Sequence, residues 1–175
     1  MKKVKVATVW LDGCSGCHMS LLDMDAAVIS LSQKIDLVYG PLVDAQEFPD
    51  SVDVTLVEGA ISSQEDLHKI QQIRQRTGLL IALGDCAVTG NVPSMRNNIP
   101  VARLLQQVYV DGACEGKVVP TEGVPPLLKQ ARPLSEFVDV DLTLPGCPPP
   151  SRVIASVLTS LIEGGKPEVL PVKFG

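Results

Sequence analysis

Short runs of apolar residues recur along the chain and predict the strands of a buried sheet. The runs are nearly continuous, rich in Val, Ile and Leu, and too short for helices, which is typical of parallel strands covered on both faces. They occupy residues 4–11, 35–39, 52–57 and 79–83. Over residues 138–144, apolar side chains instead alternate with Asp and Thr, so a fifth strand is predicted with one face less covered, nearer to the sheet edge.

Apolar residues spaced three or four apart predict helices between these strands. The first helix begins near Met19. The second begins at two overlapping capping-box patterns in 62–66 and ends at Gly78, and the last runs from Ser151 to Gly165. The apolar stripes of the three helices comprise Leu21, Met24, Val28 and Leu31; Leu67, Ile70 and Ile73; and Val153, Ile154, Val157, Leu158 and Leu161.

The stretch from residue 88 to residue 133 follows neither pattern for long. It holds six of the fourteen prolines, at positions 93, 100, 120, 125, 126 and 133. A short helix is predicted with Pro100 in its first turn and Val101, Leu104, Leu105 and Val108 on one face. The rest of 95–133 is expected to be an irregular, Pro-rich excursion over the surface before the last strand.

The order of these elements, β-α-β-β-α-β-α-β-α, predicts an α/β fold with a doubly wound parallel sheet of flavodoxin-like type. A chain of 175 residues suits a single domain, here 1–175. Right-handed crossovers place the carboxyl ends of all the strands at one edge, where such folds bind their ligands.

Four of the five cysteines follow the ends of predicted strands. Cys14 and Cys17 lie on a glycine-rich turn after the first strand, Cys86 follows the strand at 79–83, and Cys147 follows the strand at 138–144. Because these strand ends share one edge of the sheet, the four thiols are expected to converge there.

Converging thiols allow several interpretations. The Cys14-x-x-Cys17 pair alone fits a thioredoxin-like redox pair, half of a zinc site or half of an iron–sulfur site. An exchange pair would not need Cys86 or Cys147, structural zinc usually takes a second such pair, and inert core thiols suit Gly- and Pro-rich turns poorly. A cubane [4Fe–4S] cluster needs four thiolates around it, which this set can provide.

Four motifs, spread from the first strand to the last helix, resemble the small subunit of [NiFe] hydrogenases. The similarity is closest to the short small subunit of cytoplasmic, bidirectional NAD(P)-linked hydrogenases. The motifs are Gly13-Cys14-Ser15-Gly16-Cys17-His18, Val57-Glu58-Gly59, Gly84-Asp85-Cys86-Ala87 and Leu144-Pro145-Gly146-Cys147-Pro148-Pro149.

This resemblance implies an electron-transfer subunit without catalytic residues of its own. The matching cysteines, Cys14, Cys17, Cys86 and Cys147, would bind one [4Fe–4S] cluster proximal to a nickel–iron centre in a separate large subunit. Diaphorase-type iron–sulfur and flavin subunits would exchange the electrons with NAD(P). Many small subunits carry a further domain with two more clusters. None is expected here, so electrons would leave the single cluster directly for another protein.

Residues beside the cysteines are candidates for contacts around the cluster or with another subunit: Asp12, Gly13, Gly16, His18, Glu58 and Pro148. His18 would either donate a hydrogen bond to cluster sulfur or pack at a helix start or subunit interface. Glu58 and Asp12 are either carboxylates near the cluster or an interface, or ordinary residues of solvent-facing turns. Cys114 is surplus to a set of four ligands and is predicted to be a bystander.

Charge and composition exclude several partners. The net charge is −5 with no basic block, which argues against nucleic acid or an anionic membrane surface. No apolar run reaches the roughly 18 residues of a transmembrane helix. The first residues read as a strand rather than a signal peptide, so a cytoplasmic location with reduced thiols is expected. No G-x-G-x-x-G or P-loop motif is present, so NAD(P) is expected to bind another subunit, and an additional flavin at the crevice is left open.

Two other functions compete with the hydrogenase interpretation. One is the related cluster-bearing, quinone-reducing subunit of respiratory complex I, which typically carries two adjacent cysteines where this chain has Cys14-Ser15-Gly16-Cys17. The other is a small binding protein with structural zinc, which would be colourless rather than brown.

Overall fold

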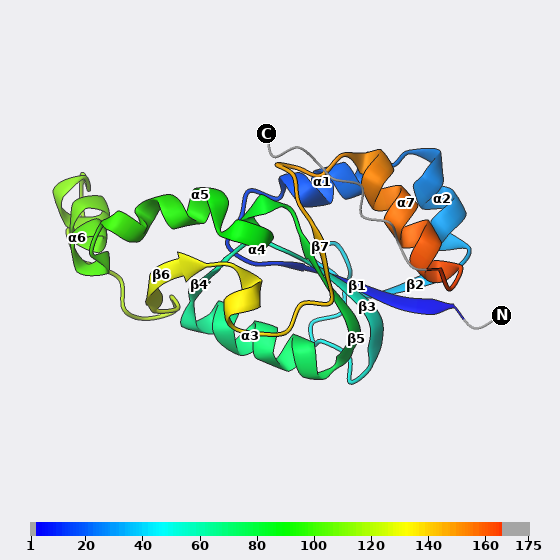
Figure 1. Cartoon of the computed structure of the whole chain (residues 1–175). Helices are drawn as coiled ribbons and strands as arrows, with labels where there is room; N and C mark the ends of the chain where they lie inside the picture. Colours follow the sequence, from blue (N-terminus) through cyan, green and yellow to red (C-terminus); the bar gives the residue numbers. More distant parts are fainter. Residues whose placement is uncertain (1–2, 166–175) are drawn as a thin grey trace.

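A five-stranded sheet lies at the centre of the protein (Figure 1). The computed structural model describes residues 3–165. The strands are β1 (Val4–Trp10), β2 (Ile35–Tyr39), β3 (Val52–Glu58), β5 (Thr77–Leu83) and β7 (Leu142–Leu144). Their order is β2-β1-β3-β5-β7, and every neighbouring pair is parallel. This is the flavodoxin-like order, so the predicted fold class is confirmed, and the last predicted strand is the edge strand β7.

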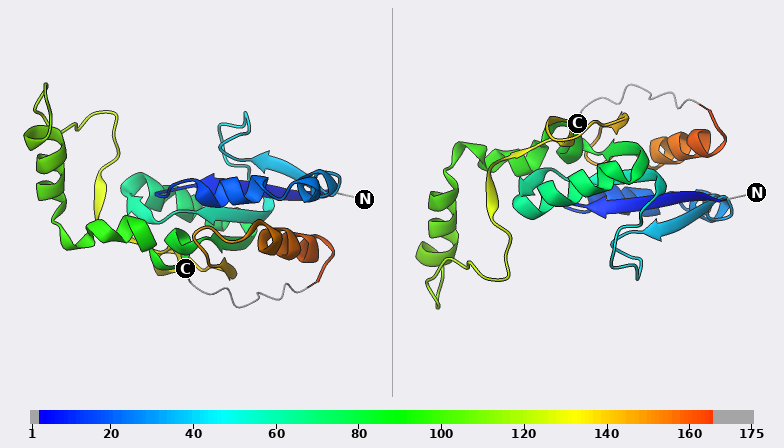
Figure 2. Two further views of the ribbon diagram at one scale, coloured as in Figure 1. Left: turned by 90° about the horizontal axis from the view of Figure 1, so that it is seen from above. Right: turned by 90° about the horizontal axis from the view of Figure 1, so that it is seen from below.

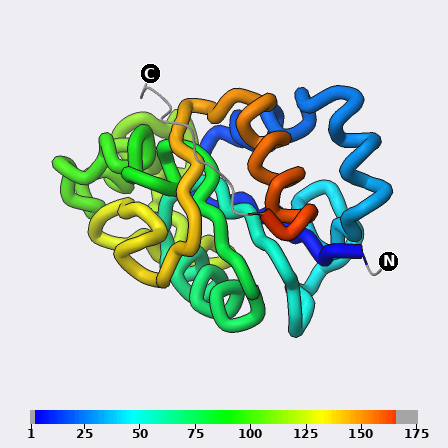
Figure 3. Tube along the Cα trace, turned by 45° about the vertical axis from the view of Figure 1, so that its right-hand side comes forward, coloured from blue at the N-terminus to red at the C-terminus, as the bar shows by residue number. Residues whose placement is uncertain are grey.

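Helices cover both faces of the sheet (Figure 1). One face carries α1 (Gly16–Leu22), α2 (Ala26–Ser32) and α7 (Ser151–Ile162), of which α2 and α7 lie side by side (Figure 3). The other face carries α3 (Gln64–Gln75) and α4 (Asp85–Thr89). Because successive side chains of a strand point to opposite faces, Leu56 belongs to the apolar cluster under α7 and Val57 to the cluster under α3.

The predicted start of α3 is confirmed in detail. Of the two overlapping capping boxes, the one formed by Ser63 and Asp66 is made. The Ser63 hydroxyl accepts from the Asp66 N–H at 3.1 Å, and the Asp66 carboxylate accepts from the Ser63 N–H at 2.9 Å.

The helix predicted from Met19 is divided in two. The N–H of Asp23 closes α1 on the carbonyl of Met19, and Asp25 then adopts a positive φ of 50° before α2 begins. With ψ at −124°, this backbone lies outside the left-handed helical region and interrupts the helix. The sequence predicted that Met24 and Leu31 share a stripe on one straight helix. In the structure, the two residues pack in the same core although the break separates them.

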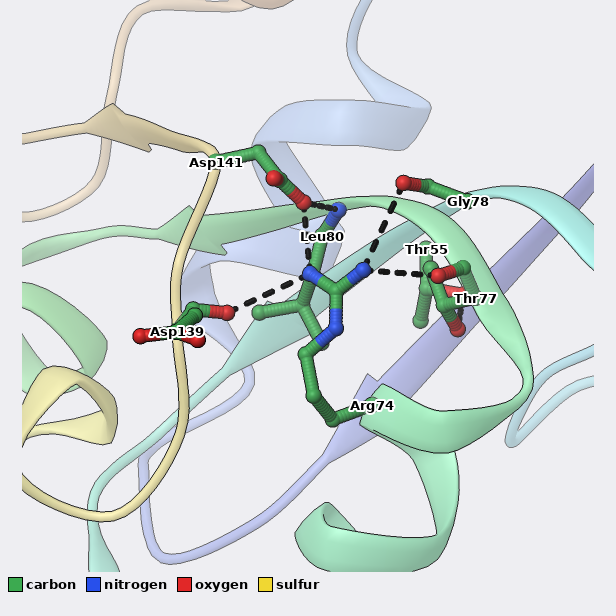
Figure 4. Close-up of polar contacts among 7 residues, drawn as sticks. All are labelled: Thr55, Arg74, Thr77, Gly78, Leu80, Asp139 and Asp141. Carbon is green, nitrogen blue, oxygen red and sulfur yellow. Dashed lines mark hydrogen bonds and ion pairs between the residues drawn. The ribbon is translucent and has the colours of Figure 1, made fainter.

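The strand predicted at 138–144 is regular only from Leu142 onward. Just before it, Asp141 contacts Leu80 through both its backbone and its side chain: its N–H donates to the Leu80 carbonyl at 3.0 Å, and its carboxylate accepts from the Leu80 N–H at 2.7 Å. Arg74 donates to the same carboxylate at 2.5 Å and to the Asp139 carbonyl at 3.2 Å (Figure 4). Burial opposes ionisation of Asp141, but the Leu80 N–H and Arg74 outweigh it and lower the pKa of this carboxyl.

The excursion at 95–133 is more regular than expected. Its predicted short helix is α6 (Val101–Gln106), which continues as η2 (Gln107–Asp111). The prediction missed β6 (Leu127–Arg132), which pairs antiparallel with β4 (Ile61–Ser63). The Asn97 side chain holds β6 from the other side, bonding both the N–H and the carbonyl of Ala131 at 2.8 Å.

Three further short elements complete the path of this region: α5 (Asn91–Ser94), η1 (Met95–Asn98) and η3 (Leu134–Glu136). The part around α6 reaches away from the main sheet (Figure 2). Within residues 3–165, no helix is long and apolar enough to cross a membrane.

Candidate metal centre

Four cysteines, from three segments that each follow a strand, surround one cavity at the carboxyl edge of the sheet. Cys14 lies in the loop after β1 and Cys17 in the first turn of α1, Cys86 lies in the first turn of α4 after β5, and Cys147 lies in the loop after β7. The cavity has a volume of about 100 Å³. Its other lining residues are Gly16, Glu58, Gly59, Asp85, Gly146 and Pro148. The predicted convergence of the four thiols is therefore present in the structure.

Cys114 is separate from this group. It lies exposed in the excursion and does not line the cavity. None of the five cysteines forms a disulfide, and Cys14 and Cys147 are exposed whereas Cys17 and Cys86 are partly buried.

The environment of the two inner thiols raises their pKa values. Burial raises the pKa of Cys17, and the negative charge of Glu58 and the other three cysteines raises it further. Burial and the neighbouring cysteines also raise the pKa of Cys86, against a smaller opposing effect of the Val92 N–H. Such a set forms thiolates when a metal centre supplies positive charge.

Glycines make the space that the sulfurs need. A Cβ on Gly84, whose φ is +83°, would lie 2.2 Å from the Cys17 sulfur. A Cβ on Gly16 would lie 3.3 Å from the Cys14 sulfur. Among residues 3–165, no three His, Cys, Asp or Glu side chains are close enough together to hold a single metal ion. The four thiols line one cavity of about 100 Å³, an arrangement that fits a cluster with one thiolate per iron.

Glu58 and His18 form a buried pair beside the cavity. The Glu58 carboxylate lies 2.6 Å from Nδ1 of His18 and accepts from the His18 backbone N–H at 2.8 Å. Glu58 is only 2% exposed, so the alternative of a solvent-facing turn is wrong for this residue. The His18 ring packs at the start of α1, edge-on to Trp10 with ring centroids 5.2 Å apart, and its Nε2 has no partner among the described residues.

Asp12 and Gly13 shape the first loop without lining the cavity. The backbone of Asp12 pairs with that of Ala60 through two hydrogen bonds, of 2.7 and 3.2 Å. Gly13 lies so close to Gly59 that a Cβ on it would come within 3.3 Å of the Gly59 Cα. Gly16 and Pro148, by contrast, do line the cavity.

Two residues that tie the loops together were missed at the level of sequence. Asp85 is buried, and its carboxylate accepts from the Gly146 N–H at 2.6 Å. The Ser20 hydroxyl of α1 donates to the Pro149 carbonyl at 2.5 Å. Asp85 belongs to the Gly84-Asp85-Cys86-Ala87 motif, but the sequence does not indicate which backbone N–H donates to its carboxylate.

This fold, with cysteines at three of its strand ends, places the chain in a known family of oxidoreductase subunits. Residues 14–161 match the family described as "NADH ubiquinone oxidoreductase, 20 Kd subunit", and the chain belongs to this family. Within it, the similarity runs to hydrogenase subunits, as the cysteine motifs predicted.

Two curated relatives and one solved structure show this similarity. The chain is 40% identical over 173 residues to a subunit of the F420-non-reducing hydrogenase vhu of Methanocaldococcus jannaschii, covering 98% of this chain and 60% of the relative. It is 37% identical over 174 residues to the delta subunit of the NAD-reducing hydrogenase HoxS of Cupriavidus necator, covering 97% and 83%. A chain in the crystal structure of an NAD+-reducing [NiFe]-hydrogenase in the H2-reduced state superposes with a TM-score of 0.93 at 35% identity, covering 98% of this chain and 100% of that one.

Proposed function

We propose that this chain is the electron-transfer small subunit of a [NiFe] hydrogenase. It would hold one [4Fe–4S] cluster, proximal to the nickel–iron site of a large subunit, and pass electrons between H2 or protons and an NAD(P)-linked diaphorase. The observation that carries this proposal is the cavity that Cys14, Cys17, Cys86 and Cys147 line together. The chain spans about 60% of the length of the first curated relatives, so the activity of those whole proteins is part of the proposal.

The chain's own residues would hold and shield the cluster. The four thiolates would each bind one iron, and the bound cluster would supply one-electron redox chemistry. Gly84 and Gly16 leave room for the sulfurs of Cys17 and Cys14, while Asp85 and Ser20 hold the Cys147 loop against its neighbours.

The surface around the cavity suits an obligate partner. Cys14 and Cys147 are exposed, as are the apolar side chains of Met19 on α1 and of Val92 on α5, whose N–H faces Cys86. Exposed apolar side chains beside a redox site indicate a surface that another subunit covers. We assign this edge to the nickel-bearing large subunit. The diaphorase-type subunits and a cytoplasmic location remain predictions.

The cysteine variants test the ligand assignment. Replacing Cys86 with Ala in the purified complex should lower the iron and sulfide content by about four atoms of each, the content of one such cluster, whereas the matched variant Cys114→Ala should keep the content of the unmodified complex. Normal iron in Cys86→Ala would refute the assignment, and iron loss confined to Cys114→Ala would mean that the fourth ligand is Cys114.

The family description favours one second candidate, the quinone-reducing subunit of a complex I-type enzyme. Metal analysis of the native complex separates the two. Nickel present together with iron and sulfide supports the hydrogenase, and iron and sulfide without nickel support the alternative. A colourless protein containing zinc would exclude both.

A further inference from the structure

The loop that carries Cys147 has very few backbone N–H groups that can donate hydrogen bonds. Four of the six residues from 145 to 150 are prolines, so only Gly146 and Cys147 have a backbone N–H there. The loop follows β7, a strand of three residues that, within the described part of the chain, pairs only with β5. Its position relative to the other cysteines therefore depends on a small number of contacts.

Asp85 provides two of these contacts to a single residue. Its backbone N–H donates to the Gly146 carbonyl at 2.9 Å, and its carboxylate accepts from the Gly146 N–H at 2.6 Å. The β5–β7 pairing is followed by a hydrogen bond from the Gly84 N–H to the Leu144 carbonyl, of 2.8 Å. The two bonds between Asp85 and Gly146 extend this pairing by one more residue. Since Asp85 directly precedes Cys86 and Gly146 directly precedes Cys147, the pair fixes the spacing of two candidate ligands.

Gly146 is shaped for this contact. Its φ is +137°, and a Cβ on it would lie 2.7 Å from the Cα of Pro149. At its far end, the loop is held by Ser20, which donates to the Pro149 carbonyl. The Cys147 loop is thus attached at Gly146 to the turn after β5 and at Pro149 to α1.

The charge of Asp85 matters as well as its hydrogen bond. Asp85 is 7% exposed and lines the cavity, and among residues 3–165 the lining contains two carboxylates, Asp85 and Glu58, but no Lys or Arg. A cluster with four thiolate ligands is already anionic, and each added electron increases its negative charge. A fixed carboxylate in a largely buried site opposes that addition, because Coulomb repulsion is weakly screened there.

We propose that Asp85 is a positioning residue for the cluster: its carboxylate holds the Cys147 loop against the Cys86 turn, and its charge lowers the reduction potential of the cluster between them. This inference rests on the proposed function. It separates into a geometric part, which any acceptor at this position satisfies, and an electrostatic part, which requires the charge.

Two substitutions in the purified complex separate the parts. Asp85→Asn keeps an oxygen that can accept from the Gly146 N–H but removes the charge. It should retain iron and sulfide and shift the EPR-monitored reduction potential of the cluster to a more positive value. Asp85→Ala leaves the Gly146 N–H without its acceptor. It should lose iron and sulfide or change the EPR line shape of the remaining cluster. Asp23→Asn, an exposed site at the end of α1 outside the cavity, makes the same change of net charge and should alter neither readout.

Each contrary result has a distinct meaning. A potential in Asp85→Asn equal to that of Asp23→Asn would overturn the electrostatic part. Full iron with an unchanged EPR spectrum in Asp85→Ala would overturn the geometric part, and so would a cluster lost from Asp85→Asn as completely as from Asp85→Ala. If the unmodified complex itself lacks iron and sulfide, both this inference and the proposed function fail, whereas a normal cluster with unaffected variants overturns the role of Asp85 alone.

Discussion

Replacing Gly84 with Ala is predicted to disable the metal centre while leaving the chain folded. Gly84 lies at the end of β5 with a φ of +83°, and its added Cβ would stand 2.2 Å from the sulfur of Cys17. Side-chain carbons essentially never approach a heavy atom closer than 3.0 Å, so the sulfur must move by at least 0.8 Å, the difference between these distances. Metal–ligand distances hold to within about 0.2 Å, so a displaced sulfur could not keep its bond to iron.

The cost to stability should be smaller than the cost to the cluster. With φ +83° and ψ 163°, Gly84 has a backbone conformation that is nearly confined to glycine, and Ala there costs about 1–3 kcal/mol. For a chain of this size, that corresponds to a drop in melting temperature of about 2–12 °C. The Cys17 sulfur can escape the clash by rotating about its single χ1 bond, which relieves the strain but turns the ligand away from the cavity.

Gly123 offers a matched control for this variant. It also has a positive φ, of +72°, but a Cβ there would meet nothing within 4 Å. Gly123→Ala should therefore show a comparable loss of melting temperature with full iron, and Gly84→Ala a comparable loss with little iron. The assay is iron and sulfide content of the purified complex beside its thermal unfolding. Equal, full iron content in both variants would refute the assignment of Cys17 as a ligand held in this position.

Three further predictions concern the surroundings of the site and the sheet. Glu58→Ala should destabilise the protein by about 1–3 kcal/mol, because it leaves the buried His18 N–H and ring nitrogen unpaired. Glu58→Gln keeps an acceptor and should cost less. Equal free energies of unfolding in urea for the two variants would contradict this prediction. Asp141 has a lowered pKa, so its contribution to stability is present above the ordinary Asp pKa of about 3.9 and is lost as the pH falls through the lowered value. Asp141→Asn should thus cost less than about 1 kcal/mol near neutral pH, since the pair with Arg74 is partly exposed, and the cost should shrink in acid; a loss independent of pH would argue against the ionic contact. Finally, the chain purified without other subunits should be redox-active but should not oxidise H2, because the one cysteine left over, Cys114, gives no second thiolate set for nickel; H2 uptake by the isolated chain would refute this.

The sheet and the cysteines could be predicted because both depend on local patterns and on chirality. The run at 52–57 is apolar almost throughout and becomes the central strand β3, in which only Asp53 is exposed. Once the parallel strands are known, right-handed crossovers bring their carboxyl ends together, and the cysteines follow their strands.

What could not be predicted depends on partners distant in the sequence. Asp85 meets the Gly146 N–H, 61 positions away, and Glu58 meets His18, 40 positions away. The strand β6 was missed because it is stabilised by the short β4 and by the Asn97 side chain rather than by its own alternation. The break between α1 and α2 was missed because the apolar spacing continues across Asp25, whose φ the spacing does not reveal.

The edge strand β7 gives the site an order of assembly during synthesis. Cys14 and Cys147 are separated by 133 positions along the chain, the difference between their numbers. At about 5–20 residues per second, the ribosome therefore finishes Cys147 roughly 7–27 s after Cys14. Once Cys86 has been made, β1, β3 and β5 can pair and bring three thiols together during the remaining 61 positions, the difference between 147 and 86, while the fourth thiol is still to be made. The nascent chain thus presents an open, three-thiol pocket. Under the proposed function, a cluster with four thiolate ligands is therefore completed only after the final strand has been made.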